Sequence, residues 1–213
     1  AGFWFFHVCA RDNAGNWGAV VTAGPFLITD TALPTACALP FERKWGSFGT
    51  GAGQFRRPFG VGAGPGGEVV VADFDNGRLQ LFDGLGNFVH QWSTAGGPVS
   101  VALDSHGHAV VSNLYAGNVQ VFALDGTLVD QWATGSPYGL TVDATDHIYA
   151  VNDAANVVTK YDHDGNFILQ FGSAGTGNGQ FLRAWGVAAA PGGDVFVTDV
   201  NGHTIQRFTS AGA

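Results

Sequence analysis

The feature that most constrains the fold of this chain is an internal repeat with a period of about 40 residues. Three segments align along their whole length: 58–92, 98–132 and 137–171. A fourth copy begins at residue 184, displaced because the Gly-rich stretch 45–57 recurs 126 residues later at 171–183. A repeat of this length indicates one supersecondary unit that is copied and stacked.

Each copy contains short runs rich in Val and aromatic residues, separated by Gly, Asp and Asn. Such runs predict β-strands joined by hairpins, and no window sustains a helical period. Four strands per copy are typical of a β-propeller blade, so the sequence predicts an all-β propeller with almost no helix. The expected strands are 60–62, 68–72, 78–82 and 88–92 in the first copy, 99–103, 109–112, 118–122 and 127–132 in the second, 147–151, 157–161 and 167–171 in the third, and 194–198 and 204–208 in the fourth.

Side-chain size follows the position of each expected strand within its copy. The innermost strands carry small residues, which suits a crowded axis: Gly60, Gly62, Ser100, Gly139, Gly186 and Ala188. The outer strands carry large rings, which we expect to fill the wedges between blades and to contribute about 1.5–3 kcal/mol each: Phe82, Phe88, Trp92, Phe122, Trp132, Phe167, Phe171 and Phe208.

The motifs of the copies keep one order: G-Q-F ends the Gly-rich stretch, and P-x-G-V, G-x-V-x-V-x-D, N-G-x-x-Q-x-F and D-x-D-G-x-F follow. In this pattern residues 43–213 resemble the NHL-repeat family of β-propellers, with Ser100, Asn113 and Asn152 as departures. The resemblance implies an NHL-type β-propeller with three full blades plus most of a fourth, as a fragment of a ring that usually has six. The remaining blades would come from the same chain, cut short at its C-terminus, or from a second copy.

Residues 1–32 are of another kind. The run F-W-F-F-H-V-C-A-R-D-N-A-G-N-W-G resembles the terminal hairpin of an Ig-like bacterial surface domain, and residues 33–42 read as a linker with two prolines. This combination implies an extracellular or cell-surface protein. Cys9 and Cys37, the two cysteines, leave open a disulfide, two buried thiols or a partner upstream. Because the chain starts at Ala1 and contains no Met, we expect a processed or truncated piece.

Composition and charge exclude several classes of protein. Charged residues make up 12% and hydrophobic residues 46% of the chain, which is unlike a disordered protein. No run of 18 apolar residues exists, so we expect no membrane insertion. The formal net charge is −8, and residues 58–213 contain 4 basic and 14 acidic residues. Some NHL propellers bind RNA through a basic face, but this balance argues against nucleic acid as a partner.

Two kinds of side chain could carry chemistry. The resemblance extends to propeller lyases, such as the virginiamycin B lyases and the peptidyl-hydroxyglycine lyases, which place His, Glu or a metal at the axis. None of the seven histidines lies on an expected innermost strand, which argues against catalysis by these residues. The carboxylate clusters 73–77 and 162–166 could hold calcium, but Asp and Asn in recurring turns bond their own backbone. We therefore expect no cofactor, with structural calcium as the alternative.

The best candidate for a functional surface is the residue between Pro and Gly at the start of the innermost strands, together with neighbouring Arg and Tyr side chains. These positions should come round on one face near the axis, where aromatic and Arg side chains suit recognition: Phe59, Val99, Tyr138 and Trp185, with Arg56, Arg57, Arg183 and Tyr115 beside them. The alternative is that the rings plug the space between blades. The sequence thus favours a non-enzymatic extracellular recognition or scaffold module that binds a protein, peptide or glycan. A lyase or hydrolase with active groups in missing blades, or a structural spacer, is the alternative.

Overall fold

The structure is a computed structural model that describes residues 7–8, 21–22 and 42–213. The chain divides into two units, residues 1–44 and 45–213. In the first unit β1 (His7–Val8) pairs antiparallel with β2 (Val21–Thr22). The rest of the expected Ig-like hairpin, its linker up to residue 41, and both cysteines lie outside the described residues. No helix in the described part of the chain is long and apolar enough to cross a membrane.

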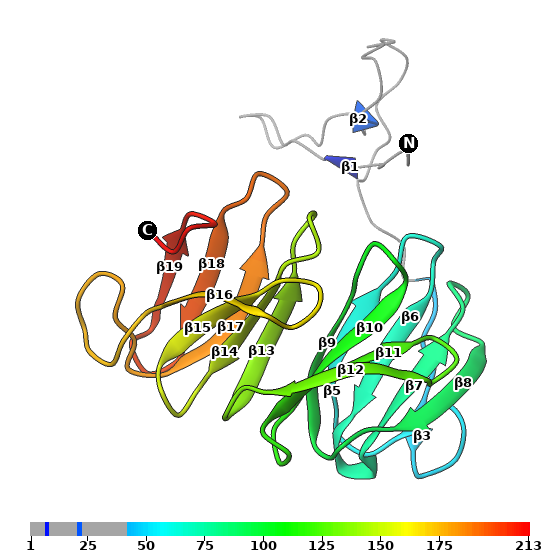
Figure 1. Cartoon of the computed structure of the whole chain (residues 1–213). Coiled ribbons are helices and arrows are strands. Elements are labelled where there is room, and N and C mark those ends of the chain that lie inside the picture. Colours follow the sequence, from blue (N-terminus) through cyan, green and yellow to red (C-terminus); the bar gives the residue numbers. More distant parts are fainter. Residues whose placement is uncertain (1–6, 9–20, 23–41) are drawn as a thin grey trace. The chain divides into compact units, whose positions relative to one another are not determined.

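The second unit contains four antiparallel sheets that follow one another in chain order, which we call blades A to D, and a short parallel pair before them, β3 (Ser47–Phe48) with β4 (Gln54–Phe55) (Figure 1). Blade A contains β5 (Pro58–Ala63), β6 (Val69–Asp73), β7 (Arg78–Phe82) and β8 (Phe88–Ser93); blade B contains β9 (Pro98–Leu103), β10 (His108–Asn113), β11 (Asn118–Ala123) and β12 (Leu128–Ala133); blade C contains β13 (Pro137–Val142), β14 (Ile148–Asn152), β15 (Val157–Tyr161) and β16 (Phe167–Phe171); blade D contains β17 (Ala184–Ala189), β18 (Val195–Asp199) and β19 (Thr204–Phe208).

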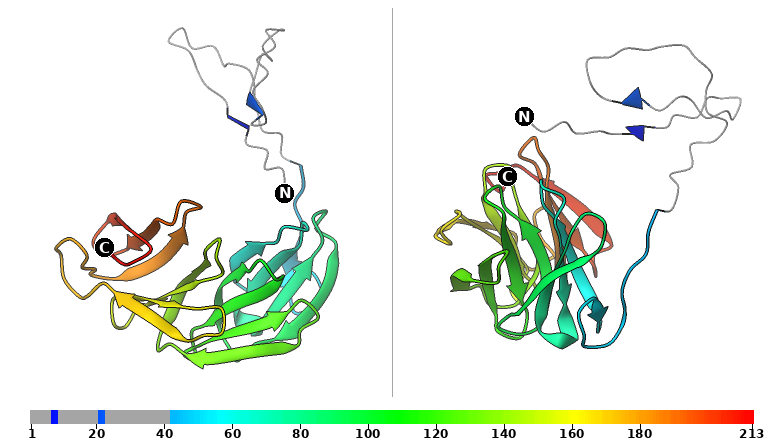
Figure 2. Two further views of the ribbon diagram at one scale, coloured as in Figure 1. Left: turned by 45° about the horizontal axis from the view of Figure 1, so that its top comes forward. Right: turned by 90° about the vertical axis from the view of Figure 1, so that its right-hand side faces the viewer.

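The first strand of each blade contacts the first strand of the next, so β5, β9, β13 and β17 form a continuous inner row. Figures 1 and 2 show the blades fanning out from this row along an open arc. Within the described residues the helical content is one 3₁₀ turn, η1 (Phe74–Asn76). The prediction of an all-β propeller with three full blades and most of a fourth is confirmed.

Several second strands extend one residue further than the sequence predicted. Asp73 ends β6 because it pairs with both Pro58 and Arg78. Asn152 and Asp199 end β14 and β18 in the same way. A polar residue that looks like the start of a turn is therefore still part of the sheet in each case.

Close approach of neighbouring inner strands explains their small residues. A Cβ atom on Gly60 would lie 2.6 Å from the carbonyl oxygen of Val99, and one on Gly139 would lie 2.5 Å from that of Trp185. Ser100 departs from this pattern, but its hydroxyl donates a hydrogen bond to the carbonyl of Leu140 in the next blade. The contact that limits side-chain size is therefore between adjacent blades, in addition to any crowding at the axis.

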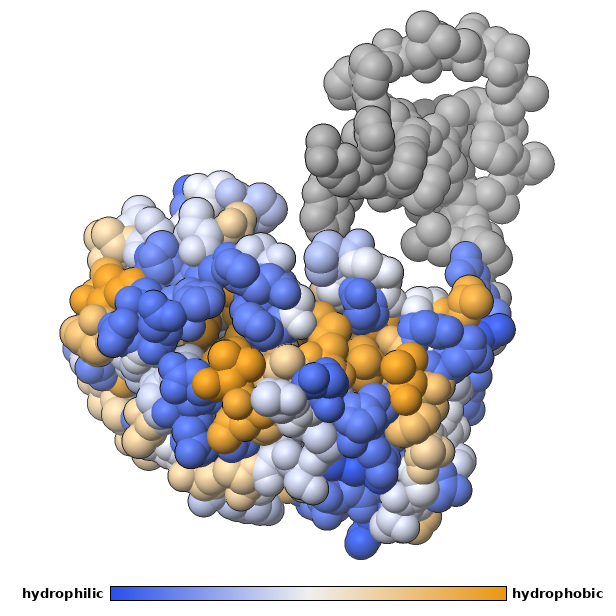
Figure 3. All heavy atoms as spheres, turned by 45° about the vertical axis from the view of Figure 1, so that its right-hand side comes forward, coloured by the Kyte–Doolittle hydropathy of each residue, from blue (hydrophilic) through white to orange (hydrophobic). Residues whose placement is uncertain are grey.

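The core consists of apolar clusters between adjacent blades, built from middle strands, the ends of outer strands and single residues of the innermost strands such as Val101 and Leu140. Trp92 and Phe171 are buried because they reach the turn of the following blade, at Gly126 and Gly212 respectively. The expectation that every outer ring is buried is wrong for Phe88 and Phe167, which are 38% and 63% exposed. Both are the first residue of an edge strand, β8 and β16 respectively. Figure 3 shows apolar residues in separate patches on one side of the surface.

Candidate recognition site

The residues predicted to form a recognition surface lie at one end of the blades. The innermost strands begin at this end, and the loops that connect the second and third strands lie there too. Antiparallel pairing places the first residues of β5 beside the last residue of β6, Asp73, and the same holds in the other blades. We call this end of the blades the aromatic face, defined by eight side chains, of which all but that of Phe74 are exposed or half-buried: Arg56, Arg57, Phe59, Phe74, Tyr115, Tyr138, Arg183 and Trp185.

A first aromatic cluster joins blades A and B. Phe59 meets Phe74 edge-on at a centroid distance of 4.8 Å, and Phe74 meets Tyr115 at 5.2 Å. Phe74 is buried, whereas Phe59 is 54% and Tyr115 73% exposed. The buried ring therefore supports two exposed ones, and the Phe59–Phe74 pair has the favourable edge-to-face geometry.

Arg57 caps this first cluster. Its guanidinium carbon lies 4.9 Å from the ring centroid of Phe74 and 5.7 Å from that of Phe59. Its Nε lies 3.3 Å from a carboxylate oxygen of Asp75, and its backbone carbonyl accepts a hydrogen bond from the amide of Phe74. Arg57 has a φ of 53°, a conformation that non-Gly residues seldom adopt.

A second cluster joins blades C and D. The rings of Tyr138 and Trp185 lie 4.0 Å apart between centroids, and both are half-buried. The guanidinium of Arg183 sits 4.5 Å from the Trp185 ring centroid. Asp153 accepts hydrogen bonds from Arg183 Nε at 2.9 Å and from its terminal nitrogen at 3.2 Å. These hydrogen bonds to Asp153 raise the pKa of Arg183 above its ordinary value, so the guanidinium stays charged.

All seven predicted site residues lie at this end, and the structure brings six of them into the two clusters: Phe59, Tyr115, Arg57, Tyr138, Arg183 and Trp185. Arg56 lies apart, 5.9 Å from the ring centroid of Phe48. Sequence reasoning missed Phe74 and Asp153. The one available signal was their position, since each directly follows the polar residue that ends a second strand.

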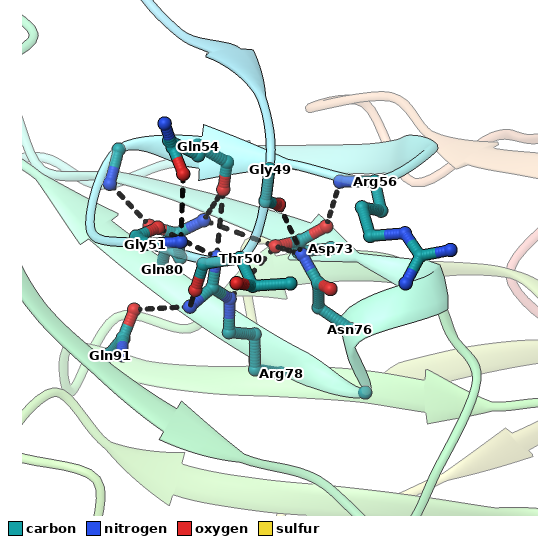
Figure 4. Close-up of polar contacts among 12 residues, drawn as sticks. Gly49, Thr50, Gly51, Gln54, Arg56, Asp73, Asn76, Arg78, Gln80 and Gln91 are labelled. Carbon is teal, nitrogen blue, oxygen red and sulfur yellow. Dashed lines mark hydrogen bonds and ion pairs between the residues drawn. The ribbon is translucent and has the colours of Figure 1, made fainter.

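A buried polar network holds the Arg56–Arg57 segment in place (Figure 4). Asp73, which is fully buried, accepts a hydrogen bond of 2.7 Å from the backbone amide of Arg56. The same carboxylate accepts one of 2.8 Å from Arg78 Nε. The two terminal nitrogens of Arg78 also donate to the carbonyls of Thr50, Gly51 and Gln54, so three of its hydrogen bonds converge on one loop.

Asp199 plays the corresponding part in blade D. Its two carboxylate oxygens accept hydrogen bonds of 2.8 Å from the amides of Leu182 and Arg183, and Gly202 N donates a third. Burial alone would raise the pKa of Asp199, but these backbone donors outweigh it and the pKa is lowered from its ordinary value. The start of the second aromatic cluster is thus fixed by an ionised carboxylate.

The histidines of blades B and C lie at the opposite end of the blades, either in the turns between strands or, for His108, at the first position of β10. His108 and His147 each bond an Asp four residues before them, Asp104 and Asp143. The described residues contain no group of three or more His, Cys, Asp or Glu arranged to hold a metal ion. In the cluster 162–166, Asp162 accepts hydrogen bonds from the backbone and side chain of Asn166, as a turn requires.

Comparison with known sequences places two parts of the chain in a described repeat. The NHL repeat family matches residues 55–82 and 181–208. The Protein brain tumor of Drosophila melanogaster is 27% identical over 144 residues, covering 62% of this chain and 14% of that protein. The B-box type zinc finger protein ncl-1 of Caenorhabditis elegans is 45% identical over 51 residues, covering 24% of this chain and 6% of that protein. The chain thus spans a small part of these relatives.

Solved structures resemble the fold. A streptogramin B lyase superposes with a TM-score of 0.64 at 14% identity, covering 73% of this chain and 52% of that one. A catalytically inactive virginiamycin B lyase from Staphylococcus aureus, solved with quinupristin, gives 0.63 at 18%, covering 73% and 53%. The WD40 propeller domain of Doa1 gives 0.57 at 13%, covering 70% and 49%. At these identities the likeness concerns the fold alone. The chain is thus an all-β protein with NHL repeats in a four-blade propeller arrangement.

Proposed function

We propose that this chain is a recognition module that binds a protein or peptide through the aromatic face. The observation that carries the proposal is the second cluster, in which Tyr138 and Trp185 lie side by side under the charged Arg183. Trp, Tyr and Arg are the residues that most often dominate binding energy at protein interfaces.

The rigidity of the second cluster supports this role. Asp153 fixes the guanidinium of Arg183 through two hydrogen bonds, and Asp199 fixes the backbone of the same residue. Side chains that are already ordered lose little conformational entropy on binding. The exposed rings of Phe59 and Tyr115 extend apolar surface onto blades A and B, which suits a ligand longer than one side chain.

The charges of this face and of the repeats indicate which class of ligand the site can bind. The arginines of this face are partly neutralised by Asp75 and Asp153, and the repeats as a whole are acidic. A polyanion such as RNA requires several unpaired cations, whereas an apolar peptide segment does not. As part of the same proposal, an extracellular or cell-surface location is supported by the acidic balance and by the resemblance of residues 1–32 to an Ig-like hairpin.

A random peptide library displayed on phage provides a direct test. Peptides selected on the wild-type chain should lose about 30-fold in affinity for Trp185→Ala, as expected for a hot spot worth about 2 kcal/mol. Phe167→Ala is the matched control, because this ring is exposed on the outer edge of blade C. It should bind like the wild type. Circular dichroism would verify that both variants fold.

Three outcomes would overturn the proposal. Selected peptides could bind Trp185→Ala as tightly as the wild type, which would show that they do not bind at the second cluster. The library could yield no peptide that binds better than a scrambled control, which is the result expected of a structural spacer. Binding confined to a glycan array, with none to peptides, would assign the face to another class of ligand.

A further inference from the structure

The charged side chains of the repeats are distributed unequally between the two ends of the blades. Three arginines, Arg56, Arg57 and Arg183, belong to the aromatic face. Most carboxylates of the four blades lie at the opposite end, in the turns that join the first strand to the second or the third to the fourth: Glu68, Asp83, Asp104, Asp125, Asp143, Asp146, Asp162, Asp164 and Asp194. This polarity directs an acidic ligand to the aromatic face and away from the opposite end.

The second residues of the innermost strands form one row across the aromatic face. Each of these strands contacts the next, and at the blade D end of the row the rings of Tyr138 and Trp185 lie 4.0 Å apart between centroids. From blade A to blade D the row reads Phe59, Val99, Tyr138 and Trp185. Phe59 is exposed and the other three are half-buried. A peptide that follows the row therefore meets an apolar or aromatic side chain on every blade.

An arginine precedes the innermost strand at each end of this row. Arg57 stands directly before β5, and Arg183 stands directly before β17. Blades B and C have the small residues Gly97 and Ser136 at this place. Each guanidinium carbon lies near the ring centroid of the row residue of its own blade, at 5.7 Å in blade A and 4.5 Å in blade D. The row thus has a cation at both ends and small side chains beside its middle.

The two arginines differ in how far their donor groups are engaged. Asp153 holds Arg183 by two hydrogen bonds, from Nε and from one terminal nitrogen. Asp75 approaches Arg57 at Nε alone, at 3.3 Å. Within the described part of the chain no hydrogen bond engages the terminal nitrogens of Arg57, and its side chain is 59% exposed. Arg57 is therefore the arginine that can donate two parallel hydrogen bonds to the carboxylate of a ligand.

The guanidinium of Arg57 is ordered before any ligand binds. The φ of 53° at Arg57 is costly for a non-Gly residue, and Arg183 at the equivalent position does not share it. Asp73 holds the segment by accepting from the amide of Arg56, and the carbonyl of Arg57 accepts from the amide of Phe74. The Phe74 ring, whose centroid is 4.9 Å from the guanidinium carbon, supports the side chain. An ordered cation loses little conformational entropy when it binds an anion.

The net charge of the aromatic face suits a ligand with one acidic side chain. Asp75 and Asp153 offset the charges of Arg57 and Arg183. Arg56 forms no ion pair with any described residue, so its charge is the uncompensated one. Because Arg56 directly precedes Arg57, this charge lies at the blade A end of the row. A single carboxylate at that end would be attracted by both arginines.

We propose that the aromatic face binds an extended peptide segment with an acidic side chain over blade A and apolar side chains over blades B to D. The carboxylate accepts hydrogen bonds from the terminal nitrogens of Arg57, and the apolar side chains pack along the row as far as Trp185. This inference rests on the proposed peptide-binding function and adds the charge of the ligand and its direction across the face.

Peptides selected on the wild-type chain provide the first part of the test. Asp or Glu should recur at one position of the aligned sequences. The peptides are then synthesised with both chain ends blocked, so that side chains supply the only carboxylates. Replacing the recurrent acid by Asn or Gln should weaken binding about fivefold, the upper end for an exposed ion pair. Fluorescence anisotropy measures both affinities.

A double-mutant cycle with Arg57→Gln identifies the partner of the peptide acid. On this variant the acidic peptide and its neutral counterpart should bind equally well. Trp185→Ala should weaken both peptides by the same factor, because the acid lies over blade A. Arg207→Gln is the matched control, since Arg207 is 68% exposed and forms a 2.8 Å ion pair with Asp194 at the opposite end of the blades. It should keep the full preference for the acidic peptide.

The outcomes separate this inference from the proposed function. Selected peptides that need Trp185 but contain no recurrent acid would overturn the inference and leave the function standing. The same follows if neutralising the peptide acid has no effect on the wild type, a result that requires no variant to fold. Equal preference for the acid on Arg57→Gln and the wild type, with unchanged circular dichroism, also overturns the inference. A library that yields no binding peptide overturns both.

Discussion

The two Gly-rich stretches, which we call the first linker (45–57) and the second linker (171–183), have similar sequences but are held by different sets of side chains. In the first, β3 (Ser47–Phe48) pairs in parallel with β4 (Gln54–Phe55), and in the second a parallel bridge joins Ala174 and Phe181. Each is anchored by one Gln and one Asp of the following blade, Gln80 with Asp73 and Gln206 with Asp199.

The difference lies at one position of the third strand. Arg78 in blade A donates five hydrogen bonds, three of them to carbonyls of the first linker, while Thr204 stands at the same place in blade D and is exposed. The second linker follows the same path without any guanidinium. The shared Gln and Asp anchors are therefore sufficient to set the path, and Arg78 adds a buried ion pair to it.

The largest expected effect is the loss of that ion pair. Arg78→Ala leaves the fully buried carboxylate of Asp73 without its cation, and breaking a buried pair from one side costs about 3–5 kcal/mol. Thr204→Ala, the matched change in blade D, should alter stability by less than about 0.5 kcal/mol. Urea unfolding of both variants measures the difference. Equal losses would mean that the buried guanidinium contributes nothing beyond the shared anchors.

A second test concerns pH and the second linker. The pKa of Asp199 is lowered in the folded chain, so its contribution to stability is present at neutral pH. That contribution is lost as the pH falls below about 3.8, the ordinary value, towards the lower folded pKa. In Asp199→Asn the urea midpoint should be lower at pH 7 and should fall less steeply in acid than that of the wild type. Parallel pH profiles for the two proteins would contradict this role for the carboxylate.

Spacing in the sequence was enough to predict the repeat, the four blades and the long linkers, because each blade is a local hairpin sheet with its own turn residues. Ser100 and Asn113, which depart from the repeat pattern, show that the spacing of motifs does not reveal the partners of individual side chains. Ser100 is accommodated through a hydrogen bond to Leu140 in another blade. Asn113 bonds Gln120 where a short connection replaces the linker. Both depend on neighbours that only the folded arrangement brings close.

The candidate site shows the same limit. The exposed rings were identifiable because they stand at equivalent positions in the copies, such as Tyr138 and Trp185. The groups that orient them were not, since Asp153 lies 30 residues before Arg183 in a different blade. Phe74 was read as part of a turn, although its ring is buried between Phe59 and Tyr115. A contact between side chains of different blades cannot be recognised from the sequence of one copy of the repeat.

A smaller effect should follow from removing the Gln anchors. Gln80 accepts from the amide of Gly53 and donates to the carbonyl of Gln54, and Gln206 does the same for Gly179 and Gln180. Replacement of either Gln by Ala should cost about 1–3 kcal/mol, because backbone groups lose their partners. Amide hydrogen exchange at Gly53 and Gly179 reports each anchor separately. Exchange that stays slow at Gly53 in Gln80→Ala would show that Arg78 and Asp73 hold the first linker without Gln80.

The smallest expected effect comes from replacing one glycine in each linker, and it tests whether the two linkers, which follow similar paths, differ in stiffness. Gly53 and Gly179 have φ values of 69° and 74°, and a Cβ at either would meet no atom within 4 Å. The cost of Ala there is therefore conformational, about 1–2 kcal/mol. The second linker lacks the arginine and can relax, so Gly179→Ala should cost less than Gly53→Ala in urea unfolding. Asn, which tolerates this conformation, should recover part of each loss. A larger loss at Gly179 would mean that the linker without the guanidinium is the stiffer of the two.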